Sequence, residues 1–138
     1  IICPAASTPD IFFEVIPMLD CLAVGLGGFI GSVARYLVSR ISIDKAGAFP
    51  INTLIINVIG SFAIGLIAAL VVKHSGLNPR LALFVRVGLC GGFTTFSTFA
   101  LETSTLLRSG SYTSAAVYVI LSLTLCVLAV FAAQRLVG

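Results

Sequence analysis

The chain has 138 residues, of which 59% are hydrophobic and 9% are charged, and its mean hydropathy is +1.16. Because charged residues make up about a quarter of an ordinary soluble domain, this composition excludes that class and predicts an all-α protein embedded in the lipid bilayer. The net charge of +3 is small, and the basic residues form no run of four or more, so we expect no nucleic-acid partner.

The first 17 residues, IICPAASTPDIFFEVIP, contain three prolines, two acidic residues and no basic residue. They therefore lack the positively charged start of a secretory signal. Met18 is the only methionine, so we expect either that the chain is a fragment or that translation begins at Met18. We assign residues 1–17 no function and treat them as an N-terminal extension.

Apolar residues fall into four segments, each long enough or nearly long enough for the ~20 residues of a membrane-spanning helix. Their approximate bounds are Leu22–Val38, Asn52–Val72, Leu81–Leu107 and Ser114–Ala133. The connections are short and hold most of the charge, which leaves no room for a soluble domain. We therefore expect one four-helix transmembrane domain, residues 18–138, with any function located between helices or between subunits.

Small residues four positions apart form two adjacent ridges on the first segment. Gly27 and Gly31 form one ridge, and Gly28 and Ser32 form the other, which predicts the close approach of another helix. Arg35 lies near the end of the same segment. Its guanidinium either extends to the membrane surface or attracts anions to a vestibule, and the sequence leaves both roles open.

Asn57 is the most informative residue of the second segment. An amide in hydrocarbon is costly unless it is hydrogen-bonded, so it either joins helices together or faces a polar path. Asn57 and Ser61 share a face with Gly65 and Ala69 at steps of four. A polar patch therefore continues into a ridge of small residues.

The third segment contains GLCGGFTTFSTF, which places glycines and hydroxyl residues inside an apolar span. We expect Gly91 and Gly92 to interrupt the third helix near its middle. Non-helical backbone in a bilayer survives only where it is buried in protein or faces a polar cavity. The carbonyl oxygens released by the interruption can hold a cation, as they do in filters and broken transporter helices.

Two phenylalanines follow this interruption, three residues apart, so Phe96 and Phe99 lie on one face of the resumed helix, with Ser97 and Thr98 beside them. An aromatic ring has a positive edge, which can stabilise a small anion without the full charge that would trap it. The alternative is that both rings pack against neighbouring side chains.

The fourth segment carries a weakly polar stripe at steps of four, formed by Tyr118, Ser122 and Cys126. These side chains either hydrogen-bond only to carbonyls of their own helix or complete a hydroxyl track with Asn57 and the two rings. Glu102 is the only carboxylate deep in the chain, and no nucleophile and base can be paired, so we expect no enzymatic activity.

Lysines and arginines are balanced between the two ends of the helices. Four belong to one side and four to the other, namely Lys73, Arg80, Arg86 and Arg135 against Arg35, Arg40, Lys45 and Arg108. This balance gives no preferred orientation in the membrane. We therefore expect the chain to insert both ways and to form an antiparallel homodimer.

These motifs together resemble the Fluc (CrcB) family of small fluoride channels. The resemblance covers Met18 to Gly138, and its most specific piece is GLCGGFTTFSTFALE, supported by GSVARY in the first segment and NTLIINVIGSF in the second. It implies a multi-pass cell-membrane protein that exports fluoride passively and so relieves fluoride toxicity. It also implies a dual-topology antiparallel homodimer with a structural sodium ion at the interface.

The resemblance also implies roles for individual residues. Phe96 and Phe99 match the aromatic pair of the fluoride pathway, and Asn57 matches the pore asparagine. The backbone carbonyls of Gly91 and Thr94 match the sodium ligands, two from each subunit. The other matches are Arg35 near the vestibule and, in the polar track, Ser97, Thr98, Tyr118 and Ser122. At Cys126 this chain has a thiol where the family pattern predicts a hydroxyl, and residues 1–17 also depart from that pattern.

Two other functions are compatible with four small helices. A proton-coupled, dual-topology exporter of the small multidrug type needs a carboxylate in the first helix, and the segment Leu22–Val38 has none. A structural assembly subunit explains the glycine ridges but not the clustered hydroxyls and rings.

Overall fold

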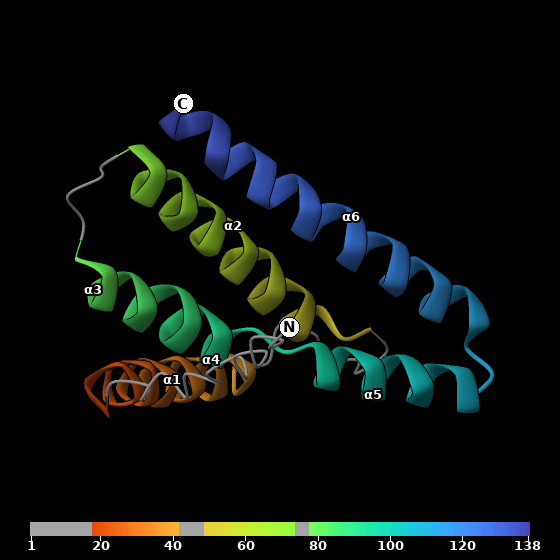
Figure 1. The fold of residues 1–138 in the computed structure, drawn as a ribbon. Coiled ribbons are helices and arrows are strands. Elements are labelled where there is room, and N and C mark those ends of the chain that lie inside the picture. Colours follow the sequence, from red (N-terminus) through yellow and green to blue (C-terminus); the bar gives the residue numbers. More distant parts are fainter. Residues whose placement is uncertain (1–17, 42–48, 74–77) are drawn as a thin grey trace, which may run out of the picture.

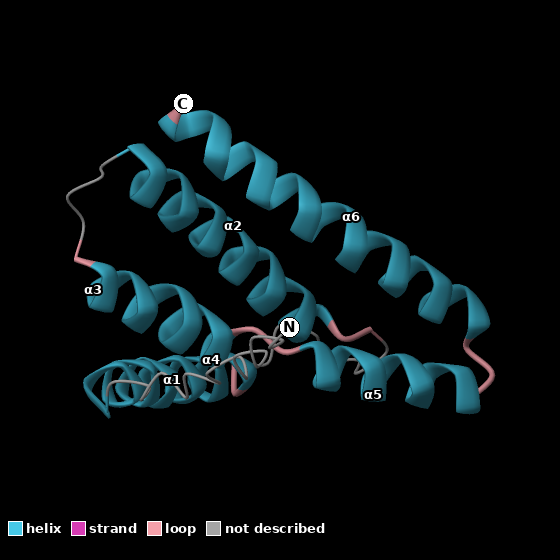
Figure 2. Ribbon diagram, in the orientation of Figure 1, coloured by secondary structure: helices cyan, strands magenta, loops and turns pink. Residues whose placement is uncertain are grey.

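The computed structural model describes residues 18–41, 49–73 and 78–138, and all of its regular structure is helical (Figures 1 and 2). Residues 1–17 and Lys45, to which the sequence analysis assigned expectations, lie outside the described residues. The helices are α1 (Met18–Ser39), α2 (Ile51–Lys73), α3 (Pro79–Leu83), η1 (Phe84–Cys90), α4 (Gly91–Phe93), α5 (Phe96–Arg108) and α6 (Tyr112–Val137).

Four helical spans in the described part of the chain are long and apolar enough to cross a bilayer. They are Met18–Ser39, Ile51–Lys73, Pro79–Arg108 and Tyr112–Val137, with mean hydropathies of 1.6, 2.5, 1.3 and 2.6. Only 11–17% of the most apolar 18-residue window of each span is buried within the chain, so the remaining side chains are half-buried or exposed. These spans confirm the predicted all-α, multi-pass membrane fold, with slightly wider bounds than the apolar segments indicated.

The third span packs on α1 through its first half and leads through its second half to the packed pair α2 and α6. Its first half, α3 to α4, lies against α1, and its second half, α5, leads to α6, which packs along α2 (Figure 1). The predicted glycine contacts are present where α1 meets the first half. A Cβ atom added at Gly92 would lie 2.5 Å from the Gly28 carbonyl oxygen, and one at Gly88 would lie 2.7 Å from the Val24 carbonyl oxygen. Only residues without side chains allow this approach.

The break in the third span lies at Thr94 and Thr95, three residues later than predicted. Gly91 is helical (φ −64°, ψ −39°), whereas Thr94 (φ −78°, ψ 158°) and Thr95 (φ −151°, ψ 111°) are extended. The expectation that Gly91 and Gly92 interrupt the helix was therefore wrong. Gly92 provides close packing instead, and the β-branched threonines, which suit extended backbone, form the break. Figure 2 shows this break as a loop between α4 and α5.

A π-helical stretch, η1, directly precedes α4. A π-helix has wider turns than an α-helix and often marks a functional region. The glycine and hydroxyl patterns of the sequence do not indicate a π-helix, so this stretch was not predicted. Its effect is to rotate the residues that follow relative to a continuous α-helix, which sets the direction in which the break faces.

Contacts at the helix ends show which termini share one end of the bundle. Arg80 Nε lies 2.8 Å from Asp20 Oδ1, which joins the start of α3 to the start of α1. The Lys73 ammonium donates to the Val137 carbonyl, which joins the ends of α2 and α6. Arg108 is in the last turn of α5, and α5 ends beside the start of α6, at the opposite end from the end of α6 (Figure 1).

We predict that Gly92→Ala destabilises the protein, because its methyl group would overlap the backbone of α1. The expected loss is about 1–3 kcal/mol, the usual cost of overpacking. Thermal unfolding in detergent measures it. Gly25→Ala is the matched control, since nothing lies within 4 Å of a Cβ atom at that position. Equal melting temperatures for the two variants would contradict the close packing of α1 on the third span.

Candidate functional site

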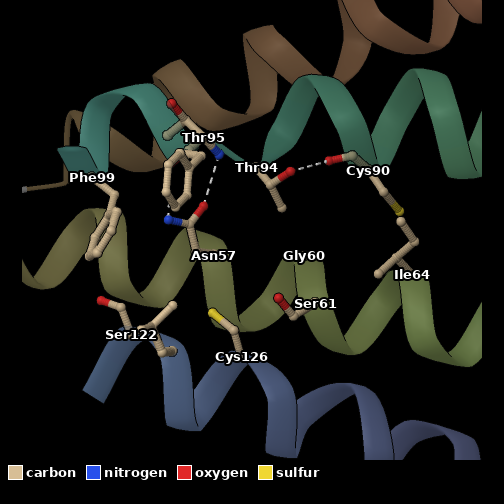
Figure 3. A pocket seen from close by; sticks show the side chains of 12 residues that line it. Asn57, Gly60, Ser61, Ile64, Cys90, Thr94, Thr95, Phe99, Ser122 and Cys126 are labelled. Atoms are coloured by element: carbon tan, nitrogen blue, oxygen red, sulfur yellow. Dashed lines mark hydrogen bonds between the residues drawn. The ribbon is translucent and has the colours of Figure 1, made fainter. Parts of the chain in front are cut away.

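A cavity of about 270 Å³ lies beside the break, between α2, α6 and the two halves of the third span (Figure 3). Both polar and apolar side chains line it. The lining residues are Asn57, Gly60, Ser61, Ile64, Cys90, Thr94, Thr95, Phe96, Phe99, Ser122, Leu123 and Cys126. The structure therefore brings together Asn57, the rings of Phe96 and Phe99, and two residues of the polar stripe, Ser122 and Cys126.

Asn57 holds the break through two reciprocal hydrogen bonds. Its Nδ2 donates to the Thr95 carbonyl oxygen at 3.1 Å, and the Thr95 N–H donates to its Oδ1 at 2.8 Å. One of these bonds is drawn in Figure 3. The amide thus replaces the backbone partners that Thr95 loses outside a helix. Of the two roles left open for Asn57, joining helices is observed directly, and the residue also lines the cavity.

Two carbonyl oxygens are left over at the break. In a continuous helix the Gly91 carbonyl would accept from the Thr95 N–H, but that group donates to Asn57 instead. Thr94 turns its own N–H and its hydroxyl back to the Cys90 carbonyl, both at 3.0 Å. Among the described residues, no hydrogen bond ends on the carbonyl oxygen of Gly91 or Thr94.

Arg35 takes a position that the sequence did not indicate. Its Nε donates to the Gly92 carbonyl oxygen at 3.0 Å, and Ser32 Oγ lies 3.5 Å from the same oxygen. The guanidinium is half-buried and is not among the cavity-lining groups. Arg35 therefore ties α1 to the end of α4 and satisfies a carbonyl next to the break.

The two predicted rings share one face of α5, with centroids 5.4 Å apart. Their exposure differs sharply, because Phe99 is 8% exposed whereas Phe96 is 74% exposed. Phe99 packs inward against Tyr118, with centroids 5.1 Å apart. Phe96 presents most of its ring to the outside of the chain, where a lipid or a second copy would meet it.

The hydroxyl residues after the break cap α5. Thr95 Oγ1 accepts from the Thr98 N–H at 3.2 Å, donates to Thr98 Oγ1 at 2.9 Å and lies 3.3 Å from Ser97 Oγ. This is the usual way in which a threonine N-cap satisfies the first amides of a helix. Ser97 is exposed, and neither Ser97 nor Thr98 lines the cavity.

The polar stripe on α6 divides into two parts. Tyr118 is fully buried outside the cavity lining, whereas Ser122 and Cys126 line the cavity. Ser122 Oγ is buried, and no hydrogen-bond partner for it exists among the described residues. Buried hydroxyls in native proteins almost always have a partner, so this hydroxyl is a donor that a small polar species in the cavity could use.

Glu102 has a role that the sequence analysis missed. Its carboxylate accepts from Thr53 Oγ1 at 2.8 Å and from the Tyr118 hydroxyl at 2.7 Å, which joins α2, α5 and α6. A carboxylate in an apolar span is a functional or structural signal by itself, because it is expensive there without partners. The sequence contains that signal but does not identify Thr53 and Tyr118 as the donors.

We predict that Asn57→Ala destabilises the fold, because it leaves the N–H and the carbonyl of Thr95 without partners in an apolar surrounding. Each such group costs about 1–3 kcal/mol. Thermal unfolding in detergent provides the measurement. Asn52→Ala is the control, since Asn52 also donates to two backbone carbonyls, but at the exposed end of α1. An Asn57 variant that melts no lower than the Asn52 variant would contradict the proposed support of the break.

Comparisons with known proteins agree with this architecture. The chain matches the family model described as CrcB-like protein, Camphor Resistance (CrcB), over residues 22–134. Its curated relatives include proteins named fluoride-specific ion channel FluC. The one from Ruminiclostridium cellulolyticum is 43% identical over 86% of this chain and 92% of the relative. The one from Shewanella sp. (strain W3-18-1) is 47% identical over 87% and 97%, and the one from Rhizobium meliloti is 44% identical over 86% and 96%.

The match extends across all four spans, since residues 22–134 begin in α1 and end in α6. The residues that hold and line the break, including Asn57 and Phe99, lie within it. The chain therefore belongs to the CrcB family.

Proposed function

We propose that this chain is a fluoride-selective channel that exports fluoride passively across the cell membrane and so relieves fluoride toxicity. Relatives that bear the name fluoride-specific ion channel and share 43–47% identity with nearly the whole chain support this proposal. The observation that carries it is the cavity beside the break. Its lining includes the Phe99 ring, the Asn57 amide and the Ser122 hydroxyl, which has no partner among the described residues.

The chemistry of this cavity suits a small anion. Hydroxyl and amide groups can donate hydrogen bonds, and ring edges carry partial positive charge. None of the described residues that line the cavity is basic, so none of them would trap an anion with a full charge. Conduction requires binding that is favourable enough for entry and weak enough for release. A set of neutral donors meets both requirements.

We also propose that the channel is an antiparallel homodimer. The Phe96 ring supports a second copy, because it lines the cavity and yet is 74% exposed on its own chain. The four-to-four balance of basic residues supports insertion in both orientations. In such a dimer, two copies of the break lie close to one two-fold axis.

A structural sodium ion at this axis is a further part of the proposal. The Gly91 and Thr94 carbonyls have no donor among the described residues, and two copies would offer four neutral oxygens. These residues fit a desolvated monovalent cation, which needs oxygen ligands and no carboxylate. The ion would supply the electrostatic partner that these carbonyls lack in hydrocarbon.

The proton-coupled exporter is not favoured. The sequence analysis expected no carboxylate in the first helix, but α1 begins earlier than expected and includes Asp20 in its first turn. Asp20 is paired with Arg80 at the end of the bundle, far from the break. Glu102, the carboxylate nearest to the cavity, lies on α5 and is held by two hydroxyl donors.

Replacing either ring of the pair should reduce fluoride efflux. We predict that Phe96→Ile and Phe99→Ile each lower the rate from liposomes, because isoleucine removes the ring edge and keeps most of the volume. A fluoride electrode measures the efflux. The control is Phe131→Ile on the exposed surface of α6, where the ring is 60% exposed. Wild-type rates in both ring variants would exclude the aromatic-edge role.

An added positive charge should bias the orientation of the chain in the membrane. We predict that the unmodified protein inserts both ways and that Gly47→Lys, in the loop between α1 and α2, shifts the population to one orientation. Cys21, exposed in α1, reports the orientation when the other three cysteines are replaced by serine. Labelling of Cys21 from one side only in the unmodified background would contradict dual insertion.

A further inference from the structure

Two cysteines line the cavity beside the break, and they differ in how deeply they are buried. Cys90, in η1, is 2% exposed, whereas Cys126, in α6, is half-buried. Both thiols are free. In Figure 3 the Cys126 side chain points from α6 toward Asn57 and Ser61 on α2. A small molecule in the cavity can therefore reach the Cys126 thiol, whereas the surrounding chain covers Cys90.

A buried hydroxyl without a partner lies one helical turn before Cys126. Ser122 is 6% exposed and lines the same cavity, and its Oγ has no hydrogen-bond partner among the described residues. Residues four apart share one face of a helix, so the hydroxyl and the thiol are neighbours on the wall that α6 contributes. None of the described lining residues is charged. This wall therefore offers a small, uncharged polar molecule a hydrogen-bond donor beside a sulfur atom.

The thiol is the group on this wall that can be modified reversibly. A deprotonated cysteine sulfur attacks the sulfur of a thiosulfonate or of a low-molecular-weight disulfide and forms a mixed disulfide, which a reducing thiol reverses. Access decides which cysteines react in this way. Of the two cysteines in the cavity lining, the half-buried Cys126 meets this condition and the buried Cys90 does not.

We propose that Cys126 is a modification site at which a small, uncharged, thiol-directed electrophile closes the fluoride path. This inference rests on the proposed fluoride-channel function and adds a means of blocking it. The Cys126 thiol loses its proton to water, and its sulfur attacks the sulfenyl sulfur of a thiosulfonate. A new S–S bond forms, and the S–S bond of the reagent breaks with release of a sulfinate. A low-molecular-weight disulfide reacts in the same way and releases a thiol.

The adduct changes the cavity in two respects. It replaces the S–H donor of Cys126 by an apolar group, and it fills part of a space of about 270 Å³. The added group also lies beside the Ser122 hydroxyl on the same face of α6. A fluoride ion in this space needs hydrogen-bond donors in place of the water that it loses, so the adduct slows conduction. If Cys126 serves only to pack against its neighbours, the adduct has no such effect.

Methyl methanethiosulfonate tests the proposal, because it is small and uncharged and leaves only a methylthio group on the sulfur. Three full-length proteins are compared in liposomes. The first keeps Cys126 as its only cysteine, with Cys3, Cys21 and Cys90 replaced by serine. The second keeps only Cys90, which lines the same cavity but is buried, and is the matched control. The third carries Cys126→Ser alone.

Fluoride efflux is measured for each protein before treatment, after treatment and after addition of dithiothreitol, and mass spectrometry counts the methylthio groups. We expect the protein with Cys126 alone to gain one group and to lose about five- to tenfold of its efflux, the scale of one lost hydrogen-bond donor together with the filled space. Dithiothreitol should restore the efflux. Treatment should leave the efflux of the other two proteins at their own untreated values.

Three results would overturn the proposal. They are the absence of a methylthio group on Cys126, a modified Cys126 with unchanged efflux, and an equal loss of efflux in the Cys126→Ser protein. If the single-cysteine proteins do not assemble, the comparison of treated wild type with treated Cys126→Ser decides alone. An untreated wild-type protein without fluoride efflux would overturn the channel function and the closure with it, and mass spectrometry would still show whether the reagent reaches Cys126.

Discussion

The structure depends on how the peptide groups around Thr94 and Thr95 are satisfied inside an apolar span. Each backbone group left without a partner in hydrocarbon costs several kcal/mol. The Asn57 amide bonds both polar groups of Thr95, and Arg35 bonds the Gly92 carbonyl. Side chains from α1 and α2 therefore hold the break from two sides, and the remaining carbonyls of Gly91 and Thr94 are available to an ion.

The support of the break also shapes the cavity. Because Asn57 occupies the turn, α5 starts in a new direction and brings Phe99 against Tyr118 on α6. Glu102 then joins α5 to Thr53 and Tyr118, which fixes the second half of the span. Ser122 lines the remaining space, and its hydroxyl has no partner among the described residues. A structural requirement, that of satisfying a broken helix, thus shapes the polar space that we propose binds an anion weakly.

Sequence patterns predicted the parts of this arrangement that depend on helical periodicity. The four spans follow from apolar length, and the close approach of another helix to α1 follows from glycines four residues apart, although the sequence did not identify that helix as the third span. The shared face of Phe96 and Phe99 follows from their spacing of three. The position of the break was not predictable in this way. Glycine serves both flexibility and close packing, and the sequence of Gly91 and Gly92 does not distinguish the two uses.

The hydrogen-bond partners of isolated polar residues could not be predicted from the sequence either. Arg35, Asn57 and Glu102 each stand out as polar groups in apolar spans, but their partners are distant in the sequence. Gly92 lies 57 residues from Arg35, Thr95 lies 38 residues from Asn57, and Thr53 lies 49 residues from Glu102. Such pairs depend on the tertiary packing of whole helices rather than on local spacing. The sequence could therefore identify the residues that matter without saying what each of them holds.

The most direct test of this account is a high-resolution experimental structure of the protein in lipid, inspected at the break. The account predicts extended backbone at Thr94 and Thr95, the Asn57 amide on Thr95, and ion density within coordination distance of the Gly91 and Thr94 carbonyl oxygens. A continuous helix through Thr95, or an ordered water in place of the ion with the carbonyls bonded elsewhere, would contradict it.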